Sequence, residues 1–182
     1  MMKDLSMHIL DIAQNSVRAE ATDILLEIDE NPAENRLTIT IGDNGKGMSA
    51  EMLESVRDPF TTSRTTRKVG LGIPMLEQTC LQCGGKLDLI STPGKGTTIT
   101  ASMDYNNIDR PPLGDLVDSL LILVITNQHI NFKYSHIYNG NPFVFNTAEI
   151  KEVLGDVPFD EPDVRDWIKG FLTEGLAEIK EG

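Results

Sequence analysis

Apolar positions follow a helical period at the start of the chain and a strand period directly after it. Over residues 6–19, the apolar residues that share one side of a helix are Ile9, Ile12, Ala13, Val17 and Ala19. Residues 24–28 and 37–41 then alternate broadly between apolar and polar side chains, with the turn-rich NPAEN between them. The pattern predicts one amphipathic helix followed by an antiparallel pair of strands.

Two more helices and two more strands are expected in the rest of the first hundred residues. Ser49 suits the start of a short helix in SAEMLESV. The stretch GLGIPMLEQTCLQCGG has Pro74 in a first helical turn and two glycines at its end. Strands are expected at residues 86–91 and 97–103, on either side of the turn TPGKGT. Residues 58–70 lack periodicity and are rich in hydroxyl and basic side chains, which predicts a loop.

The chain changes character after about residue 104. The stretch NNIDRPPLGD contains two adjacent prolines and several turn formers, so we expect a linker at residues 105–112. Beyond it we predict a small α+β module over residues 113–182, separate from the unit formed by residues 1–104. Its expected elements are a helix at 113–126, strands at 131–138 and 142–146, and helices at 147–154 and 162–178. Trp167 and Phe171, one helical turn apart, are expected in its core.

Composition narrows the classes of partner. The chain has 182 residues, of which 40% are hydrophobic and 24% charged, as is ordinary for a globular protein. Its net charge of −12 disfavours a nucleic-acid partner, because binding phosphates along a strand needs clustered Lys and Arg. The longest apolar stretch, residues 120–125, is far shorter than the roughly 20 residues that span a bilayer. No basic-then-apolar leader opens the chain, so we expect a cytoplasmic protein that binds neither nucleic acid nor membrane.

Four polar residues and three glycine-rich loops carry the candidate chemistry. His8, Asp11, Asn15 and Arg18 are spaced 3, 4 and 3, so they form one stripe on the first helix. A solvated helix face would give the same stripe. The loops DNGKGM, GLGIP and TPGKGT invite a phosphate hypothesis, because glycine lets the free backbone N–H groups of a helix start approach an anion.

Other interpretations of these motifs fit less well. No G-x-x-x-x-G-K-[ST] or G-x-G-x-x-G pattern occurs. DNGKGMSAEMLE resembles a calcium loop, but Gly45 replaces an oxygen ligand and Met48 replaces the required glycine, so we reject calcium. Cys80 and Cys83 form a single C-x-x-C. Because there is no second pair to complete a zinc site, we expect them to be small buried hydrophobic residues.

Taken in order, four sequence boxes resemble those of the GHKL, or Bergerat-fold, ATPases. The boxes are the helix stripe ending in NSVRA, the loop DNGKGM, the loop GLGIPML and the turn STPGKGTTI, and together they cover about residues 5–104. The resemblance implies an α/β (α+β) fold, a two-layer sandwich of a mixed β-sheet covered on one face by helices. It identifies residues 1–104 as a histidine-kinase-like or anti-sigma-factor-kinase-like ATP-binding domain, followed by the small module of unknown function.

By resemblance, the D-x-G-x-G box recognises the adenine base. Asp43 would accept a hydrogen bond from the adenine amino group, a charge-assisted bond that contributes about 1.5 to 3 kcal/mol. Gly45 and Gly47 would keep the wall of the site thin enough for the base to reach it. Thr97 would help close the site near the adenine.

The helix stripe and the second glycine loop are expected at the phosphates. Asn15 would hold Mg²⁺ through its side-chain oxygen, and Arg18 is at the position of a phosphate-contacting lysine in many histidine kinases. Asp11 is the catalytic candidate, one methylene shorter than the glutamate of gyrase-like members, and would act as general base. Further phosphate contacts are expected from the lid and loop residues Thr62, Lys68, Gly70, Leu71 and Gly72.

The implied cofactors are ATP and Mg²⁺, and three functions remain open. The first is transfer of the γ-phosphate to an unidentified partner protein, a phosphoacceptor or regulatory target. The second is an ATPase that switches conformation, and the third is a non-catalytic adenine-nucleotide sensor. The chain lacks a dimerisation helix pair with a phosphoacceptor histidine, and the sequence leaves a homodimer open.

Overall fold

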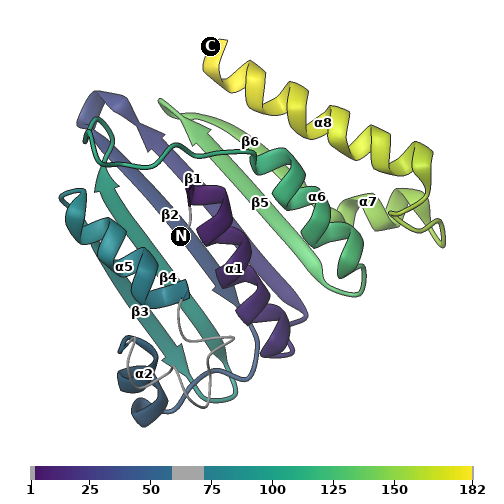
Figure 1. Ribbon diagram of the computed structural model, residues 1–182. Helices are drawn as coiled ribbons and strands as arrows, with labels where there is room; N and C mark the ends of the chain where they lie inside the picture. The colour runs from purple at the N-terminus through teal and green to yellow at the C-terminus, as the bar shows by residue number, and fades with distance from the viewer. Residues whose placement is uncertain (1–2, 59–71, 182) are drawn as a thin grey trace.

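The computed structural model describes residues 3–58 and 72–181, and six strands in these ranges form one sheet (Figure 1). The strand order is β3-β4-β2-β1-β5-β6, and every neighbouring pair is antiparallel except β1 and β5. The strands are β1 (Asp23–Asn31), β2 (Arg36–Asp43), β3 (Lys86–Thr92), β4 (Gly96–Asp104), β5 (Asn131–Tyr138) and β6 (Asn141–Asn146).

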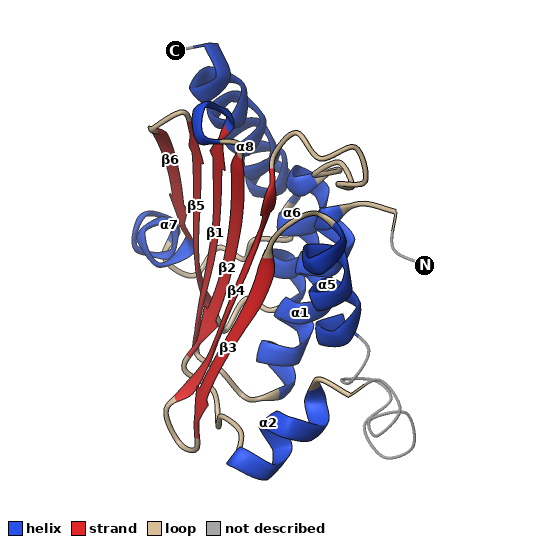
Figure 2. Cartoon of the chain, turned by 90° about the vertical axis from the view of Figure 1, so that its left-hand side faces the viewer, coloured by secondary structure: helices blue, strands red, loops and turns tan. Residues whose placement is uncertain are grey.

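A layer of helices covers one face of this sheet. The helices are α1 (Leu5–Arg18), α2 (Ala50–Val56), α5 (Gly72–Gln82), α6 (Leu116–Thr126), α7 (Thr147–Leu154) and α8 (Pro162–Glu181), with a short 3-10 turn η1 (Pro32–Glu34) between β1 and β2. Figure 2 shows α1, α5, α6 and α8 on one side of the strands and α7 on the other. The predicted fold class, a mixed sheet with helices layered on one face, is confirmed.

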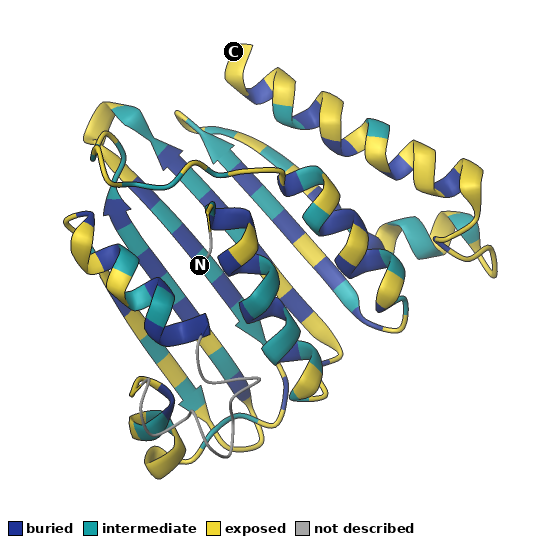
Figure 3. Cartoon of the chain, viewed as in Figure 1, coloured by how far each residue is buried: buried dark blue, intermediate teal, exposed yellow. Residues whose placement is uncertain are grey.

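Alternation along the strands decides which side chains enter the core. In β1, Ile24, Leu26 and Ile28 are buried, and the two residues between them are more exposed, as alternation across a sheet requires. Figure 3 shows the same alternation of buried and more exposed positions along the strands. Helix α1 starts where the Asp4 side chain accepts a hydrogen bond from the Met7 N–H, and its apolar side then packs onto these strands. Each fully buried Leu or Ile stabilises the fold by about 1.5 to 3 kcal/mol.

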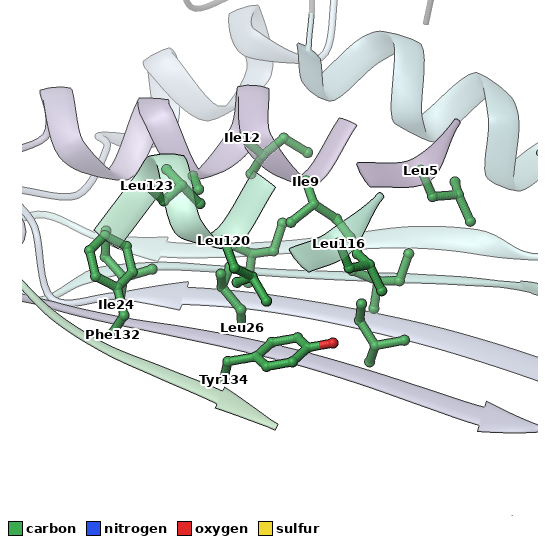
Figure 4. Packing of buried hydrophobic residues seen from close by; sticks show 14 of the residues in the cluster. Leu5, Ile9, Ile12, Ile24, Leu26, Leu116, Leu120, Leu123, Phe132 and Tyr134 are labelled. Carbon is green, nitrogen blue, oxygen red and sulfur yellow. The ribbon is translucent and has the colours of Figure 1, made fainter. Parts of the chain in front are cut away.

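The second stretch of the chain extends the same sheet. Strand β5 pairs in parallel with β1, with Phe132 opposite Ile24 and Tyr134 opposite Leu26. Side chains of α1 and α6 meet over these two strands in one apolar cluster (Figure 4). The domain boundary at residues 105–112 stays a prediction, to which the structure adds that the residues on its two sides share one sheet and one core.

The connection after β4 packs on the start of α1 before α6 begins. The Leu5 and Ser6 N–H groups donate to the Pro112 and Leu113 carbonyls at 2.9 and 2.8 Å. Helix α6 begins at Leu116 rather than at the predicted residue 113, because the Asp115 side chain accepts from the Asp118 N–H and caps the helix.

Two further predictions concern single side chains. Cys80 and Cys83 are buried free cysteines, which confirms their prediction as small hydrophobic residues. The prediction that Trp167 and Phe171 lie in a core is wrong, because their side chains are 53% and 38% exposed. The core side of α8 is instead formed by Val164, Ile168, Leu172 and Ile179.

Candidate functional site

A mostly apolar pocket of about 160 Å³ opens beside the end of β2. It lies between the C-terminal half of α1, the loop after β2, helix α2 and the start of β4. The residues that line it are Ile12, Asn15, Ser16, Arg18, Ala19, Ile41, Asp43, Lys46, Gly47, Met48, Met52, Val56, Ile73, Thr97 and Ile99. Such a pocket, apolar apart from a few polar groups, is typical of a small-molecule site.

The carboxylate of Asp43 is held in this pocket from two sides. Asp43 ends β2, where the pairing of β2 with β4 sets it opposite Thr97. Its Oδ2 accepts a hydrogen bond from the Ser16 hydroxyl at 2.6 Å, and its Oδ1 accepts from the Gly45 N–H at 2.8 Å. The carboxylate is therefore oriented by the protein itself.

Glycine is required where the loop after β2 meets the turn between β3 and β4. Gly47 has φ +70°, and a Cβ at this position would clash with the Thr92 carbonyl. The two segments are joined by hydrogen bonds from the Gly94 N–H to the Lys46 carbonyl at 2.7 Å and from the Met48 N–H to the Ser91 hydroxyl at 2.8 Å. The close contact forms one wall of the pocket.

Asn44 fixes the other side of the same loop. Its side-chain oxygen accepts from the Thr22 and Asp23 N–H groups at 2.9 and 3.0 Å, at the start of β1. Its side-chain amide donates to the Thr22 hydroxyl at 2.8 Å. An aspartate and an asparagine in sequence thus anchor the loop to both α1 and β1.

The polar stripe of α1 runs from the pocket toward the start of α5. Arg18 donates to the side-chain oxygen of Asn15 at 2.7 Å, and both residues line the pocket. One turn earlier, the Asp11 carboxylate lies against Gly72, where a Cβ would clash with it. Burial raises the pKa of Asp11, although the nearby Arg18 and His8 act in the opposite direction.

His8 continues the stripe into the protein interior. Its side chain is buried, and its Nδ1 has no hydrogen-bond partner among the residues that the structure describes. Burial lowers the pKa of this imidazole, although the charges of Asp11 and Asp4 oppose the shift. His8 is therefore an interior part of the stripe, and its burial favours the neutral imidazole.

The structure brings several of the predicted site residues together. Asn15, Arg18, Asp43, Gly47 and Thr97 line one pocket. Gly45 donates to the Asp43 carboxylate beside the pocket, and Asp11 meets Gly72 next to it. Thr62, Lys68, Gly70 and Leu71 lie outside the described residues.

Sequence reasoning missed other residues of the pocket. Ser16 carried a usable signal, since a hydroxyl on the apolar side of a helix needs a hydrogen-bond partner when it is buried. The local sequence does not predict the pocket residues Lys46, Met48 and Met52, because their positions depend on how the loop after β2 folds over α1.

Two absences hold for the part of the chain that the structure describes. No three His, Cys, Asp or Glu side chains there are grouped to hold a metal ion. Asn15 offers the pocket a side-chain amide oxygen, an uncharged ligand of the kind that Mg²⁺ accepts when phosphates and water complete its shell. No helix in residues 3–58 and 72–181 is both long and apolar enough to cross a membrane.

Comparison with known proteins places these features in a family. Residues 3–107 match the family of histidine kinase-, DNA gyrase B- and HSP90-like ATPases. The chain is 27% identical over 111 residues to the sensor histidine kinase ZraS of Klebsiella oxytoca, an alignment that covers 60% of this chain and 24% of that protein. It is 30% identical over 95 residues to sporulation kinase D of Bacillus subtilis, with 52% and 19% covered.

Solved structures agree with this assignment at the level of the fold. The ATPase domain of Aquifex aeolicus MutL, complexed with ADP, matches with a TM-score of 0.50 and 15% identity, over 85% of this chain and 70% of that chain. This chain spans about a quarter or less of the two kinases named above. Since the family match covers more than half of the chain, the chain belongs to the histidine kinase-, DNA gyrase B- and HSP90-like ATPases.

Proposed function

We propose that the pocket beside β2 binds Mg-ATP and that the chain transfers the γ-phosphate to a partner protein. The observation that carries the proposal is the Asp43 carboxylate, oriented by Ser16 and Gly45 inside a mostly apolar pocket. A half-buried carboxylate in such surroundings favours ligands that donate a hydrogen bond to it.

The base that fits this carboxylate is adenine. Adenine carries an amino group that can donate to Asp43, whereas guanine has a carbonyl at the corresponding position and would set acceptor against acceptor. The apolar side chains of Met48, Ile73 and Ile99 suit the faces of a flat base. The fit favours adenine nucleotides over guanine nucleotides.

Phosphates are expected along the α1 stripe, on the side of the pocket nearer α5. Arg18 supplies a positive charge there, and Asn15 supplies a neutral oxygen that would serve as one ligand of Mg²⁺. When bound, Mg²⁺ would neutralise charge on the phosphates. Gly72 at the start of α5 has no side chain of its own, and the Asp11 carboxylate lies against it, so Mg²⁺ would also be needed to offset the negative charge between Asp11 and the phosphates.

Transfer to a partner protein is supported by the kinases among the relatives. His8 is unsuited to be the phosphoacceptor, because its ring is buried within the helix layer. The proposed acceptor belongs to another protein, and the reaction requires that protein to reach the pocket.

Hydrolysis by the chain alone is the second candidate, and Asp11 favours it. Its raised pKa and its contact with the start of α5 suit a general base that acts near the phosphates. In this function, nucleotide turnover would change the conformation of the chain without a phosphorylated product.

Turnover measured with and without other proteins separates these functions. We expect the purified chain to release little phosphate from γ-labelled ATP and to label a protein in an extract of the source cells. Steady release without an extract, abolished in Asp11→Asn, would instead establish the ATPase. Tight binding with neither release nor transfer would leave a nucleotide sensor.

A further inference from the structure

Helix α8 carries a stripe of exposed residues that no described part of the chain covers. We call Asp163, Trp167, Phe171, Glu174 and Glu178 the aromatic–acidic stripe; their spacing of 4, 4, 3 and 4 puts them on one side of the helix. All five are exposed. The Trp167 and Phe171 rings stack, with centroids 5.2 Å apart and planes inclined by 16°.

The stripe faces away from the rest of the helix layer. Lys169, on the opposite side of α8, pairs with Asp118 of α6 at 3.8 Å. On the near side, the Phe171 ring lies 5.4 Å from the Phe143 ring and 6.2 Å from the Phe145 ring, both on β6. The aromatic–acidic stripe is therefore beside the outermost strand, β6.

Strand β6 has a free edge without the usual protection by charge. It is the last strand of the sheet in residues 3–58 and 72–181, and its sequence NPFVFN contains no charged residue, although Pro142 removes one N–H donor. The opposite edge strand, β3, carries Lys86 and Asp88, which pair at 3.5 Å. Edge strands normally carry such charges because unpaired backbone groups attract other strands. The β6 edge thus combines open backbone groups with the exposed side chains of Val144, Trp167 and Phe171.

We propose that this edge binds an extended, basic segment of a partner protein, which pairs with β6 as an additional strand. Apolar side chains of the segment would pack on Trp167 and Phe171, and its Lys or Arg residues would meet Asp163, Glu174 and Glu178. Strand addition supplies backbone hydrogen bonds, and the neighbouring side chains supply specificity.

Charge selects this occupant over a second copy of the chain. A copy docked edge to edge would bring an equally acidic stripe against the first one, in a chain of net charge −12. Aromatic side chains beside a free edge are also the residues that contribute most to protein interfaces. The proposal does not depend on nucleotide binding.

The test begins with a displayed library of random decapeptides panned on the full chain. We expect enrichment of peptides that alternate apolar residues with Lys or Arg. Trp167 is the only tryptophan of the chain, so an enriched synthetic peptide should shift its fluorescence to shorter wavelength. If no peptide is enriched, if the enriched peptides are acidic, or if they leave the Trp167 emission unchanged, the proposal is wrong.

Charge variants provide the second measurement, read by the anisotropy of a labelled enriched peptide. Asp163→Lys with Glu174→Lys should weaken binding about tenfold or more. Glu149→Lys with Glu152→Lys, on exposed positions of α7, makes the same change in net charge and should alter affinity much less. Equal effects of the two pairs would overturn the proposal, as would a stable dimer in light scattering that Trp167→Ala dissociates. Mg-ATP titrations of the same variants show separately whether the nucleotide site is intact.

Discussion

Ser16 of α1 donates a hydrogen bond to the Asp43 carboxylate at the end of β2, across 2.6 Å. The two residues are 27 positions apart, and their contact joins the helix layer to the sheet at the pocket. Since Gly45 binds the other carboxylate oxygen, the acceptor is oriented before any ligand arrives. Such orientation reduces the ordering cost of binding.

Ser16→Ala should therefore weaken adenine-nucleotide binding without unfolding the protein. A hydrogen bond to a charged group contributes about 1.5 to 3 kcal/mol. Because only part of this free energy contributes to ligand binding, we expect the affinity for Mg-ADP to fall about tenfold. Calorimetric titration of Mg-ADP measures it. Ser119→Ala on α6, away from the pocket, is the matched control. An unchanged affinity in Ser16→Ala would show that the hydroxyl does not orient Asp43 for binding.

Gly47→Ala should destabilise the fold more than Gly94→Ala. Both glycines have positive φ, +70° and +78°, which costs a residue with a Cβ about 1 to 2 kcal/mol. Only at Gly47 would the Cβ also clash with the Thr92 carbonyl, whereas Gly94 has open space around it. We expect a total loss of about 2 to 5 kcal/mol for Gly47→Ala. Urea unfolding compares the two, and equal losses would contradict the close contact of loop and turn.

His8 should make the protein less stable as the pH falls from about 7 to about 5. Its pKa in the folded protein lies below the ordinary 6.5, because the ring is buried. The unfolded chain therefore binds the proton first, so stability is complete above pH 6.5 and declines below it. Asp4 and Asp11 moderate the effect through their charges.

Unfolding measured across this pH range should give a flatter profile in His8→Gln. His129→Gln is the control, since His129 is exposed, and should keep the wild-type profile. A His8→Gln profile as steep as that of the wild type would assign the pH dependence to other groups.

The pair of Glu30 and His136 should hold β1 and β5 together. His136 Nε2 lies 2.6 Å from the Glu30 carboxylate, and both side chains are almost completely buried. The Tyr105 hydroxyl donates to the other carboxylate oxygen at 3.1 Å. His136→Phe removes one partner of a buried charge, which costs about 3 to 5 kcal/mol.

A double variant tests whether that cost comes from the charge left behind. Glu30→Leu combined with His136→Phe should recover much of the lost stability, because it removes the carboxylate as well. Chemical unfolding of the single and double variants measures the coupling. If the double variant loses as much free energy of unfolding as the two single variants together, the side chains of Glu30 and His136 do not stabilise each other.

Local patterns were sufficient to predict the α-helices and strands that the structure describes, but not the 3-10 turn η1 or the start of α6. The period of α1, the alternation of β1 and β2 and the glycines beside α5 each depend on neighbouring residues, which the sequence displays directly. The stripe of Asp11, Asn15 and Arg18 was predictable for the same reason, since helical spacing alone puts them on one side.

Long-range contacts were not predictable from such patterns. The parallel pairing of β1 with β5 joins residues more than a hundred positions apart, such as Ile24 and Phe132. Alternation of apolar and polar residues predicts that a strand forms, but it does not predict which strand will pair with it. The exposure of Trp167 was missed because Val164, Ile168 and Leu172 already complete the core side of α8. An aromatic residue off that side stays in solvent.

Adenine recognition by Asp43 is tested most directly by calorimetric titration of Mg-ADP and Mg-GDP into the wild type and Asp43→Asn. Diphosphates avoid turnover during the measurement. We predict that the wild type binds Mg-ADP at least about tenfold more tightly than Mg-GDP, and that Asp43→Asn loses most of this preference. Equal binding of the two nucleotides by the wild type, or no binding of either, would contradict the assignment of the pocket as an adenine-nucleotide site.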